Sequence, residues 1–204
     1  TCIPVSPKFR MQISKEDARK ELGLPVDKQI ILIMSGGVGC ESIKPLIKKF
    51  RKYGIPEDRF YCILAGNNAK LKETIAKSCS SDKVQAVGFT DKVHLYLKAA
   101  DVVISKSGGL SSTEVAVANV PVVHFQPIPG CETCNARFYE AKGMSKLAKN
   151  SKEALKIAEA LLENEAERQS MVEAQRREIN AYSADDVVKR VVEVVEARNA
   201  TEEE

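Results

Sequence analysis

From Gln29 onward, short apolar segments alternate with amphipathic stretches, and this alternation is the strongest constraint on the fold. Each apolar segment has the length and composition of a buried strand, and we expect strands at 30–35, 60–65, 84–87, 102–105 and 122–125. Helical patterns occupy the intervals between and after them, at 43–53, in a lysine-rich stretch that ends near Cys79, and at 92–99, 110–118 and 132–142. Strands and helices that alternate with short links form parallel βαβ units. The sequence therefore predicts an α/β fold with a Rossmann-like, doubly wound parallel sheet.

After Asn150 the pattern changes to helices alone. We expect Ser151 and Ser183 to be N-caps, and Asp185 and Asp186 follow the second of them in its first turn. The segment 181–183 is the expected break between the last two helices.

Composition excludes several classes of protein. The chain has 204 residues, 44% of them hydrophobic, and a formal net charge of only +3, which gives no support for nucleic-acid binding. The longest apolar run, 30–34, is far shorter than the roughly 20 residues that span a bilayer. No signal peptide precedes the first expected element, and a chain that begins at Thr1 is expected to be a piece of a longer protein. The six scattered cysteines favour reduced thiols in a cytosolic protein over a disulfide framework.

Three loops follow expected strands at the end where doubly wound sheets bind ligands. The first contains Gly36, Gly37 and Gly39, whose backbone amides could approach a phosphate at a helix start. It lacks the G-x-x-x-x-G-K-[ST] pattern of a P-loop, so a simple strand-to-helix turn is an equal alternative.

The second loop reads K-S-G-G-L-S-S-T-E and leads from the strand at 102–105 into a helix. Gly108 and Gly109 and the hydroxyl residues after them suit an anion at a helix N-terminus. Glu114 lies about one turn further on and could accept hydrogen bonds from a ribose diol. The alternative is a capping glutamate on an exposed face.

The third loop reads P-I-P-G-C-E-T-C-N and presents Glu132 and Asn135 on neighbouring faces of a helix. Such groups suit a sugar, and a plain surface loop is the alternative.

Six motifs in order resemble the C-terminal half of a GT-B glycosyltransferase of family 28. They are T-x-I-P-V-x-P-x-F, G-G-x-G, A-G-N-N, G-F-T-D, A-A-D-V-V-I-S-K-x-G-G-L-S-x-x-E and P-I-P-G-x-E-x-x-N-A, between Thr1 and about Leu147. Within that family the chain is most similar to the processive diacylglycerol glucosyltransferases and monogalactosyldiacylglycerol synthases, and more distantly to the GlcNAc transferase of peptidoglycan lipid synthesis.

The resemblance implies a site for a UDP-sugar, with no cofactor and no metal. The backbone around Phe89 and Thr90 would hold the uracil, and Glu114 would bind the ribose. The amides of the glycine loops would bind the diphosphate, and Glu132 and Asn135 would contact the hexose. The implied diphosphate residues are Gly36, Gly37, Gly39, Gly108, Gly109, Leu110 and Ser111.

The resemblance also implies a division of labour between two domains. Residues 1–28 would be a linker from an N-terminal domain, 29–150 the UDP-sugar-binding domain, 151–200 C-terminal helices and 201–204 an acidic tail. The catalytic base and the lipid acceptor would belong to the N-terminal domain, so we expect no catalytic residue in this chain. The whole protein would be cytoplasmic and peripheral at the inner face of the membrane.

Three positions depart from the family pattern: Cys2 replaces a glycine, Ser6 replaces an arginine near the donor phosphates, and Cys131 replaces a glutamine that faces the sugar. The last two leave the identity of the sugar, and activity itself, open.

Other functions compete with this interpretation. Cys131 and Cys134 form a C-x-x-C at a helix start, the position of a reactive thiol in redox proteins, although the flanking residues differ from the thioredoxin pattern. A zinc site would need a second C-x-x-C or a histidine pair, which the sequence lacks. A non-catalytic UDP-sugar-binding subunit, or one chain of a two-protein transferase, remains an alternative.

The helix expected at 43–53 carries five basic residues, Lys44, Lys48, Lys49, Arg51 and Lys52. They could favour an anionic membrane surface, but a solvated helix face is the preferred interpretation.

Overall fold

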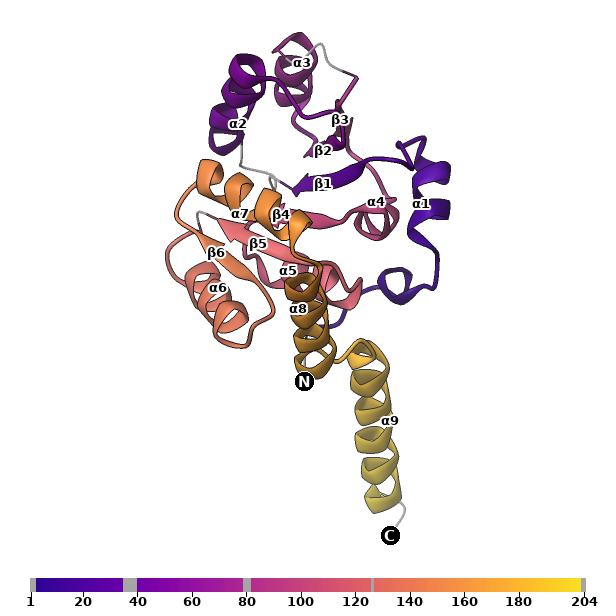
Figure 1. Cartoon of the computed structure of the whole chain (residues 1–204). Helices are drawn as coiled ribbons and strands as arrows, with labels where there is room; N and C mark the ends of the chain where they lie inside the picture. Colours follow the sequence, from indigo (N-terminus) through magenta and orange to yellow (C-terminus); the bar gives the residue numbers. More distant parts are fainter. Residues whose placement is uncertain (1–2, 35–39, 79–81, 126, 203–204) are drawn as a thin grey trace.

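The computed structural model describes residues 3–34, 40–78, 82–125 and 127–202. Its six strands form one sheet in the order β3-β2-β1-β4-β5-β6, and every neighbouring pair is parallel (Figure 1). The strands are β1 (Gln29–Met34), β2 (Arg59–Gly66), β3 (Val84–Gly88), β4 (Val102–Ser105), β5 (Val122–Phe125) and β6 (Lys146–Ala148). This order confirms the predicted doubly wound α/β fold.

Helices precede, connect and follow the strands. They are the 3-10 helix η1 (Pro7–Arg10) and the α-helices α1 (Lys15–Leu22), α2 (Cys40–Tyr53), α3 (Ala69–Ser78), α4 (Val93–Ala99), α5 (Gly109–Val117), α6 (Cys131–Ala141), α7 (Ser151–Glu163), α8 (Glu165–Glu178) and α9 (Ser183–Glu202).

Two apolar clusters cover the two faces of the sheet, because alternate strand residues point to opposite sides. Ile31 and Ile33 of β1 belong to the cluster formed with α2, α3 and α7. Ile30 and Leu32 belong to the cluster formed with η1, α1, α4 and α5. All four side chains are buried, so β1 is a central strand enclosed on both faces.

The last helix, α9, projects away from the rest of the chain (Figure 1). It carries six exposed valines between Val187 and Val195. Among the residues that the structure describes, no helix is long and apolar enough to cross a membrane.

Helix α1 lies inside the segment expected to be a linker, and local signals explain it. Its N-cap, Ser14, accepts a hydrogen bond from the amide of Asp17 at 3.0 Å, and Glu16 adds a second carboxylate to the first turn. Gly23 ends the helix with a φ of 64°, a conformation that glycine adopts without a Cβ penalty.

One buried arginine ties α1 to the sheet. The guanidinium of Arg19 donates to an Asp101 carboxylate oxygen at 2.7 Å and to the carbonyl of Ala99 at 2.9 Å. The same Asp101 oxygen accepts from the amide of Ile30 at 2.7 Å. Since both charged groups are bonded to partners, this ion pair fixes α1 against the amino ends of β1 and β4.

Several element ends differ from the expectation. The third residue before β6, Gly143, has a φ of 74° and ends α6, and β6 itself was not predicted. The N-cap of α7 is Asn150, whose side chain accepts from the amide of Glu153 at 3.1 Å, so the prediction of Ser151 as the cap is wrong. Ser183 is the first residue of α9, and its hydroxyl donates to the carbonyl of Ile3 at 3.2 Å.

Candidate functional site

The strand order places a topological switch point between β1 and β4. From β1 the chain continues to β2 and β3 on one side, and it then returns to β4, β5 and β6 on the other. Helices therefore leave the carboxyl ends of these two strands in opposite directions, and a crevice forms there in folds of this kind. The loop after β4 lies at this point. The loop after β1, with Gly36, Gly37 and Gly39, lies outside the described residues.

Hydrogen bonds join the loop after β4 to the start of α6. The hydroxyl of Ser107 donates to the carbonyl of Glu132 at 2.7 Å, and the Asn135 amide donates to the carbonyl of Ser107 at 3.0 Å. A Glu132 carboxylate oxygen accepts from the amide of Ile128 at 2.7 Å. Two loops that are separate in the sequence therefore form one cluster at the carboxyl edge of the sheet, as expected for the second and third loops.

The N-terminus of α5 is open within this cluster. Gly108 is its N-cap and has no side-chain capping bond, so the amides of Gly109, Leu110 and Ser111 form a first turn without a side-chain acceptor. Amides at the start of a helix attract anions, since their partial charges add to the positive end of the helix dipole. The arrangement can therefore bind a phosphate group.

Gly109 lies against the N-terminal segment of the chain. A Cβ at this position would lie 2.8 Å from Cδ1 of Ile3 and 3.7 Å from the amide nitrogen of Asn135. A side chain here would require Ile3 to shift, so glycine allows the close approach of three segments. Ile3 belongs to the first of the six sequence motifs, but only the structure shows that it contacts Gly109.

Glu114 is half-buried on α5, three residues beyond Ser111 and hence on a neighbouring face. Burial raises the pKa of its carboxyl group. Within the described part of the chain the structure gives this carboxylate no hydrogen bond or ion pair. A half-buried carboxylate without a partner is costly, which suits a group that receives its hydrogen-bond donors from a ligand.

Below the loops, a buried polar contact links β5 to α5. His124 Nε2 lies 3.2 Å from the hydroxyl of Ser112, and burial lowers the pKa of His124 to about 4. The ring packs edge-on against Tyr139 of α6, with centroids 5.5 Å apart. Near neutral pH this histidine is therefore uncharged and fixes α5, β5 and α6 relative to one another.

Phe89 and Thr90 follow β3, the edge strand, so β2 and β1 separate them from β4. With strands about 4.8 Å apart, that offset is about 14 Å across the sheet. The Phe89 side chain is 76% exposed, and the Thr90 hydroxyl accepts from the amide of Lys92 at 3.1 Å. These two residues lie at the same edge as the α5–α6 cluster but not in it.

The metal and thiol alternatives depend on where the cysteine, histidine and acidic side chains lie. Among the residues that the structure describes, no group of three histidine, cysteine or acidic side chains could hold a metal ion. Cys131 and Cys134 are exposed free thiols, and Cys131 Sγ lies 3.9 Å from the amide nitrogen of Asn135. Cys131 therefore faces the same cluster as the predicted sugar contacts.

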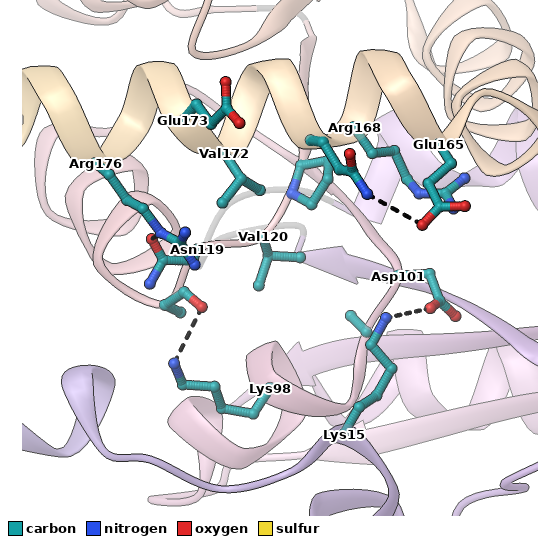
Figure 2. Close-up of a pocket in the computed structure, with 14 residues that line it drawn as sticks. Lys15, Lys98, Asp101, Asn119, Val120, Glu165, Arg168, Val172, Glu173 and Arg176 are labelled. Carbon is teal, nitrogen blue, oxygen red and sulfur yellow. Dashed lines mark hydrogen bonds and ion pairs between the residues drawn. The ribbon is translucent and has the colours of Figure 1, made fainter.

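A second concavity, of about 450 Å³, lies at the opposite, amino edge of the sheet (Figure 2). There Lys15 pairs with Asp101 at 2.5 Å, and Lys98 donates to the carbonyl of Ala118 at 3.1 Å. Arg176 donates to the Asn119 side chain at 3.0 Å. Because these polar groups are bonded to one another, this pocket offers few free groups to a ligand.

Comparisons with known proteins identify relatives. The model of the Glycosyl transferases group 1 family matches residues 14–178. A processive diacylglycerol beta-glucosyltransferase of Bacillus pumilus is 27% identical over 196 residues, which are 95% of this chain and 50% of that protein. The enzyme of the same name from Bacillus subtilis is 29% identical over 169 residues, 81% of this chain and 43% of that protein. The chain thus spans about half the length of the curated relatives that it matches.

Solved structures share the fold. MurG of Acinetobacter baumannii superposes with a TM-score of 0.63 at 20% identity, over 94% of this chain and 57% of that one. WaaG, a glycosyltransferase involved in lipopolysaccharide biosynthesis, gives a TM-score of 0.67 at 17% identity, over 93% and 54% of the two chains. The resemblance stated from the motifs is confirmed. The chain belongs to the Glycosyl transferases group 1 family, is related to the processive diacylglycerol beta-glucosyltransferases, and forms one Rossmann-like half of a GT-B fold.

Proposed function

We propose that this chain is the donor-binding half of an inverting glycosyltransferase that moves a hexose from a UDP-sugar to diacylglycerol. The observation that carries the proposal is the start of α5, which has no side-chain cap, beside the carboxylate of Glu114, for which the described residues supply no partner. An anion acceptor and a diol acceptor, one turn apart, match the diphosphate and ribose of a nucleotide.

In this proposal the diphosphate is held by backbone amides. Gly109, Leu110 and Ser111 supply the amides of α5, and Gly108 lets the phosphate approach closely. Gly36, Gly37 and Gly39 are proposed to contribute further amides. The amides hold the negative charge that develops on UDP as the bond to the sugar breaks. No divalent metal is needed for this neutralisation.

The nucleoside and sugar ends lie on opposite sides of the diphosphate. Glu114 accepts the two ribose hydroxyls, and the backbone around Phe89 and Thr90 contacts the uracil. Glu132, Asn135 and Cys131 face the hexose from the start of α6. The bonds that Glu132 and Asn135 make to Ile128 and Ser107 support this part of the proposal, because they hold both side chains in place before the donor arrives.

The acceptor side of the reaction is proposed to involve other residues. An inverting transfer needs a base that deprotonates the acceptor hydroxyl on the face opposite the departing UDP. We propose that the base and the diacylglycerol site belong to the half of the relatives that this chain does not match. The activity of the related diacylglycerol glucosyltransferases supports diacylglycerol as the acceptor. With a lipid acceptor, the proposed reaction takes place at the cytoplasmic face of a membrane.

Calorimetric titration of the chain with UDP in the presence of a chelator tests donor binding. We expect binding without metal and weaker binding of CDP and ADP. A strict requirement for Mg²⁺ or Mn²⁺, or equal binding of the three nucleotides, would contradict the proposal.

Incubation with labelled UDP-glucose or UDP-galactose and diacylglycerol tests the division of labour. We expect no glycolipid from residues 1–204 alone, because positioning and water exclusion depend on both halves. Steady formation of glycolipid would place the catalytic machinery within this chain.

A further inference from the structure

Helices α2 and α7 enclose a groove of about 830 Å³ that is lined almost entirely by lysines. The two other lining residues are Pro45 and Tyr53, and within the described residues no carboxylate lines it. The lysines are Lys44, Lys48, Lys49, Lys52, Lys152 and Lys156. Arg51, the fifth basic residue of α2, is not among them.

Helical spacing and packing explain this concentration of charge. Lys44, Lys48 and Lys52 recur at intervals of four on α2, and Lys152 and Lys156 do so on α7. The opposite faces of the two helices are buried in the same apolar cluster, which fixes the helices side by side (Figure 1). Two lysine rows that are about 100 residues apart in the sequence therefore face one groove, which no single-helix pattern predicts.

Four of the groove lysines present exposed charge. Lys49 is instead paired, with its ammonium group 3.0 Å from a Glu159 carboxylate oxygen. Lys48, Lys52, Lys152 and Lys156 are exposed. Several ammonium groups around one concavity repel each other, and an anionic partner removes that cost.

We propose that this lysine groove docks the protein on the anionic headgroups of a phospholipid membrane. Tyr53 is 71% exposed at the end of α2, with the Lys52 ammonium group 4.9 Å from the centre of its ring. An exposed tyrosine beside lysines is typical of a protein surface at a membrane interface, where the ring enters the headgroup layer and the ammonium groups meet lipid phosphates.

The position of the groove suits this role. Both α2 and α7 begin at the carboxyl edge of the sheet, because each follows a strand, and the open start of α5 lies at the same edge. The groove begins at this edge with Lys44 and Lys152 and runs along both helices to Lys52 and Tyr53 at the far end of α2. A membrane that covers the groove would therefore reach the edge that holds the donor site. This inference rests on the proposed function, in which the acceptor is a membrane lipid.

The chemistry favours a lipid surface over nucleic acid. Single-stranded nucleic acids bind to stacking platforms of several aromatic rings and to planar arginines, whereas the groove contains one tyrosine and no arginine. Lysines act as point charges that suit a diffuse layer of phosphates.

The test measures sedimentation of the 204-residue chain with vesicles of pure phosphatidylcholine and with vesicles that contain phosphatidylglycerol. We expect binding to the anionic vesicles only, weakened by salt. The double variant Lys48→Gln/Lys156→Gln should bind them about 25-fold more weakly, since each lysine near such a surface is worth about fivefold. The matched control Lys20→Gln/Lys189→Gln removes the same charge from α1 and α9 and should stay within twofold of the unmodified chain.

Three results would overturn the inference: equal binding to neutral vesicles, equal loss in the groove and control variants, or groove-dependent binding to poly(U) in place of vesicles. Calorimetry with inorganic phosphate is the remaining arm, and phosphate binding without vesicle binding would make the groove a small-anion site. UDP affinity, measured on every variant, should not change. Vesicle binding without UDP binding would sink the proposed function alone, and the reverse would sink this inference alone.

Discussion

The two edges of the sheet treat their polar groups in opposite ways. At the amino edge, Asp101 is bonded to both Arg19 and Lys15. Lys98 and Arg176 are bonded to nearby acceptors in the pocket at this edge (Figure 2). At the carboxyl edge, the first turn of α5 has no side-chain cap and Glu114 has no partner among the described residues. The comparison teaches that charge alone does not mark a binding site. A binding site is marked by hydrogen-bonding groups, such as the α5 amides and the Glu114 carboxylate, that the fold itself leaves without partners among the described residues.

The largest expected effect concerns the amino edge of the sheet, where Arg19 pairs with Asp101. Arg19→Met should lower the free energy of unfolding by about 3–5 kcal/mol, because it breaks the ion pair with the partly buried Asp101 and leaves the buried carbonyl of Ala99 without its Arg19 donor. Urea unfolding would measure this, with Lys15→Gln as the control that removes only the exposed partner of the same aspartate. A loss below about 1 kcal/mol in Arg19→Met would show that the amino edge does not depend on this pair.

The second effect concerns His124, which lies beneath the loops at the carboxyl edge of the sheet. The pKa of His124 is about 4 in the fold and 6.5 as the reference value, so the unfolded chain takes up a proton first as pH falls. Stability from this group is complete above about pH 6.5 and is lost towards pH 4, by about 3 kcal/mol in total.

His124→Gln should therefore lose less stability than the unmodified chain when urea unfolding is compared at pH 7 and pH 4.5. Parallel losses in the two proteins would mean that the fold does not lower the pKa of His124.

Glu114→Gln tests the carboxyl edge directly, because it should raise thermal stability and lower UDP affinity. Its pKa is raised by burial, so its ionised form costs stability above that pKa, and Glu114→Gln should raise the midpoint of thermal unfolding at pH 8. UDP affinity should fall at least about tenfold, since hydrogen bonds to a charged acceptor are worth roughly 1.5–3 kcal/mol each.

The matched control is Glu140→Gln on the exposed face of α6, which should change neither quantity. If Glu114→Gln binds UDP as the unmodified chain does, Glu114 is a surface carboxylate and not a ribose ligand.

The smallest effect tests the close approach at the open edge. Gly109→Ala should cost about 1 kcal/mol of stability, because its methyl group would displace Ile3. Gly108→Ala is the control, since its φ is −62° and its Cβ would meet only a Glu132 oxygen at 4.0 Å. In a double-mutant cycle, Ile3→Ala should recover most of the Gly109→Ala loss. Additive losses would show that the contact with Ile3 is not limiting.

Much of the sheet could be predicted from the sequence, because five of its strands are apolar runs bounded by turns. The strand β6 was missed since it has three residues and begins with a lysine. Helix α1 was missed although Ser14, Asp17 and Gly23 are ordinary capping signals, because its low apolar content hides it from periodicity.

The site divides in the same way. Glycines and carboxylates after strands can be predicted because the strand direction fixes their edge. The contact of Ile3 with Gly109, and the Ser112–His124 pair, could not, because each joins segments whose distance only tertiary packing sets. For the same reason, the sequence does not predict that the lysines of α7 share one groove with those of α2. The predicted contacts to uracil, ribose, diphosphate and hexose remain predictions.

The path of α7 has a consequence for how the protein is made. This helix, residues 151–163, lies over β4, β5 and β6 and packs on α2, so it completes the cover of Ile31, Ile33 and Ile104. Synthesis proceeds from the N-terminus at about 5–20 residues per second, so about 50 residues beyond Ile104 must follow before that cover exists, which takes several seconds. During this interval the nascent sheet presents an apolar face to solvent. A ribosome-bound chain that ends before residue 150 should therefore bind chaperones and aggregate, whereas a chain that includes α7 should not.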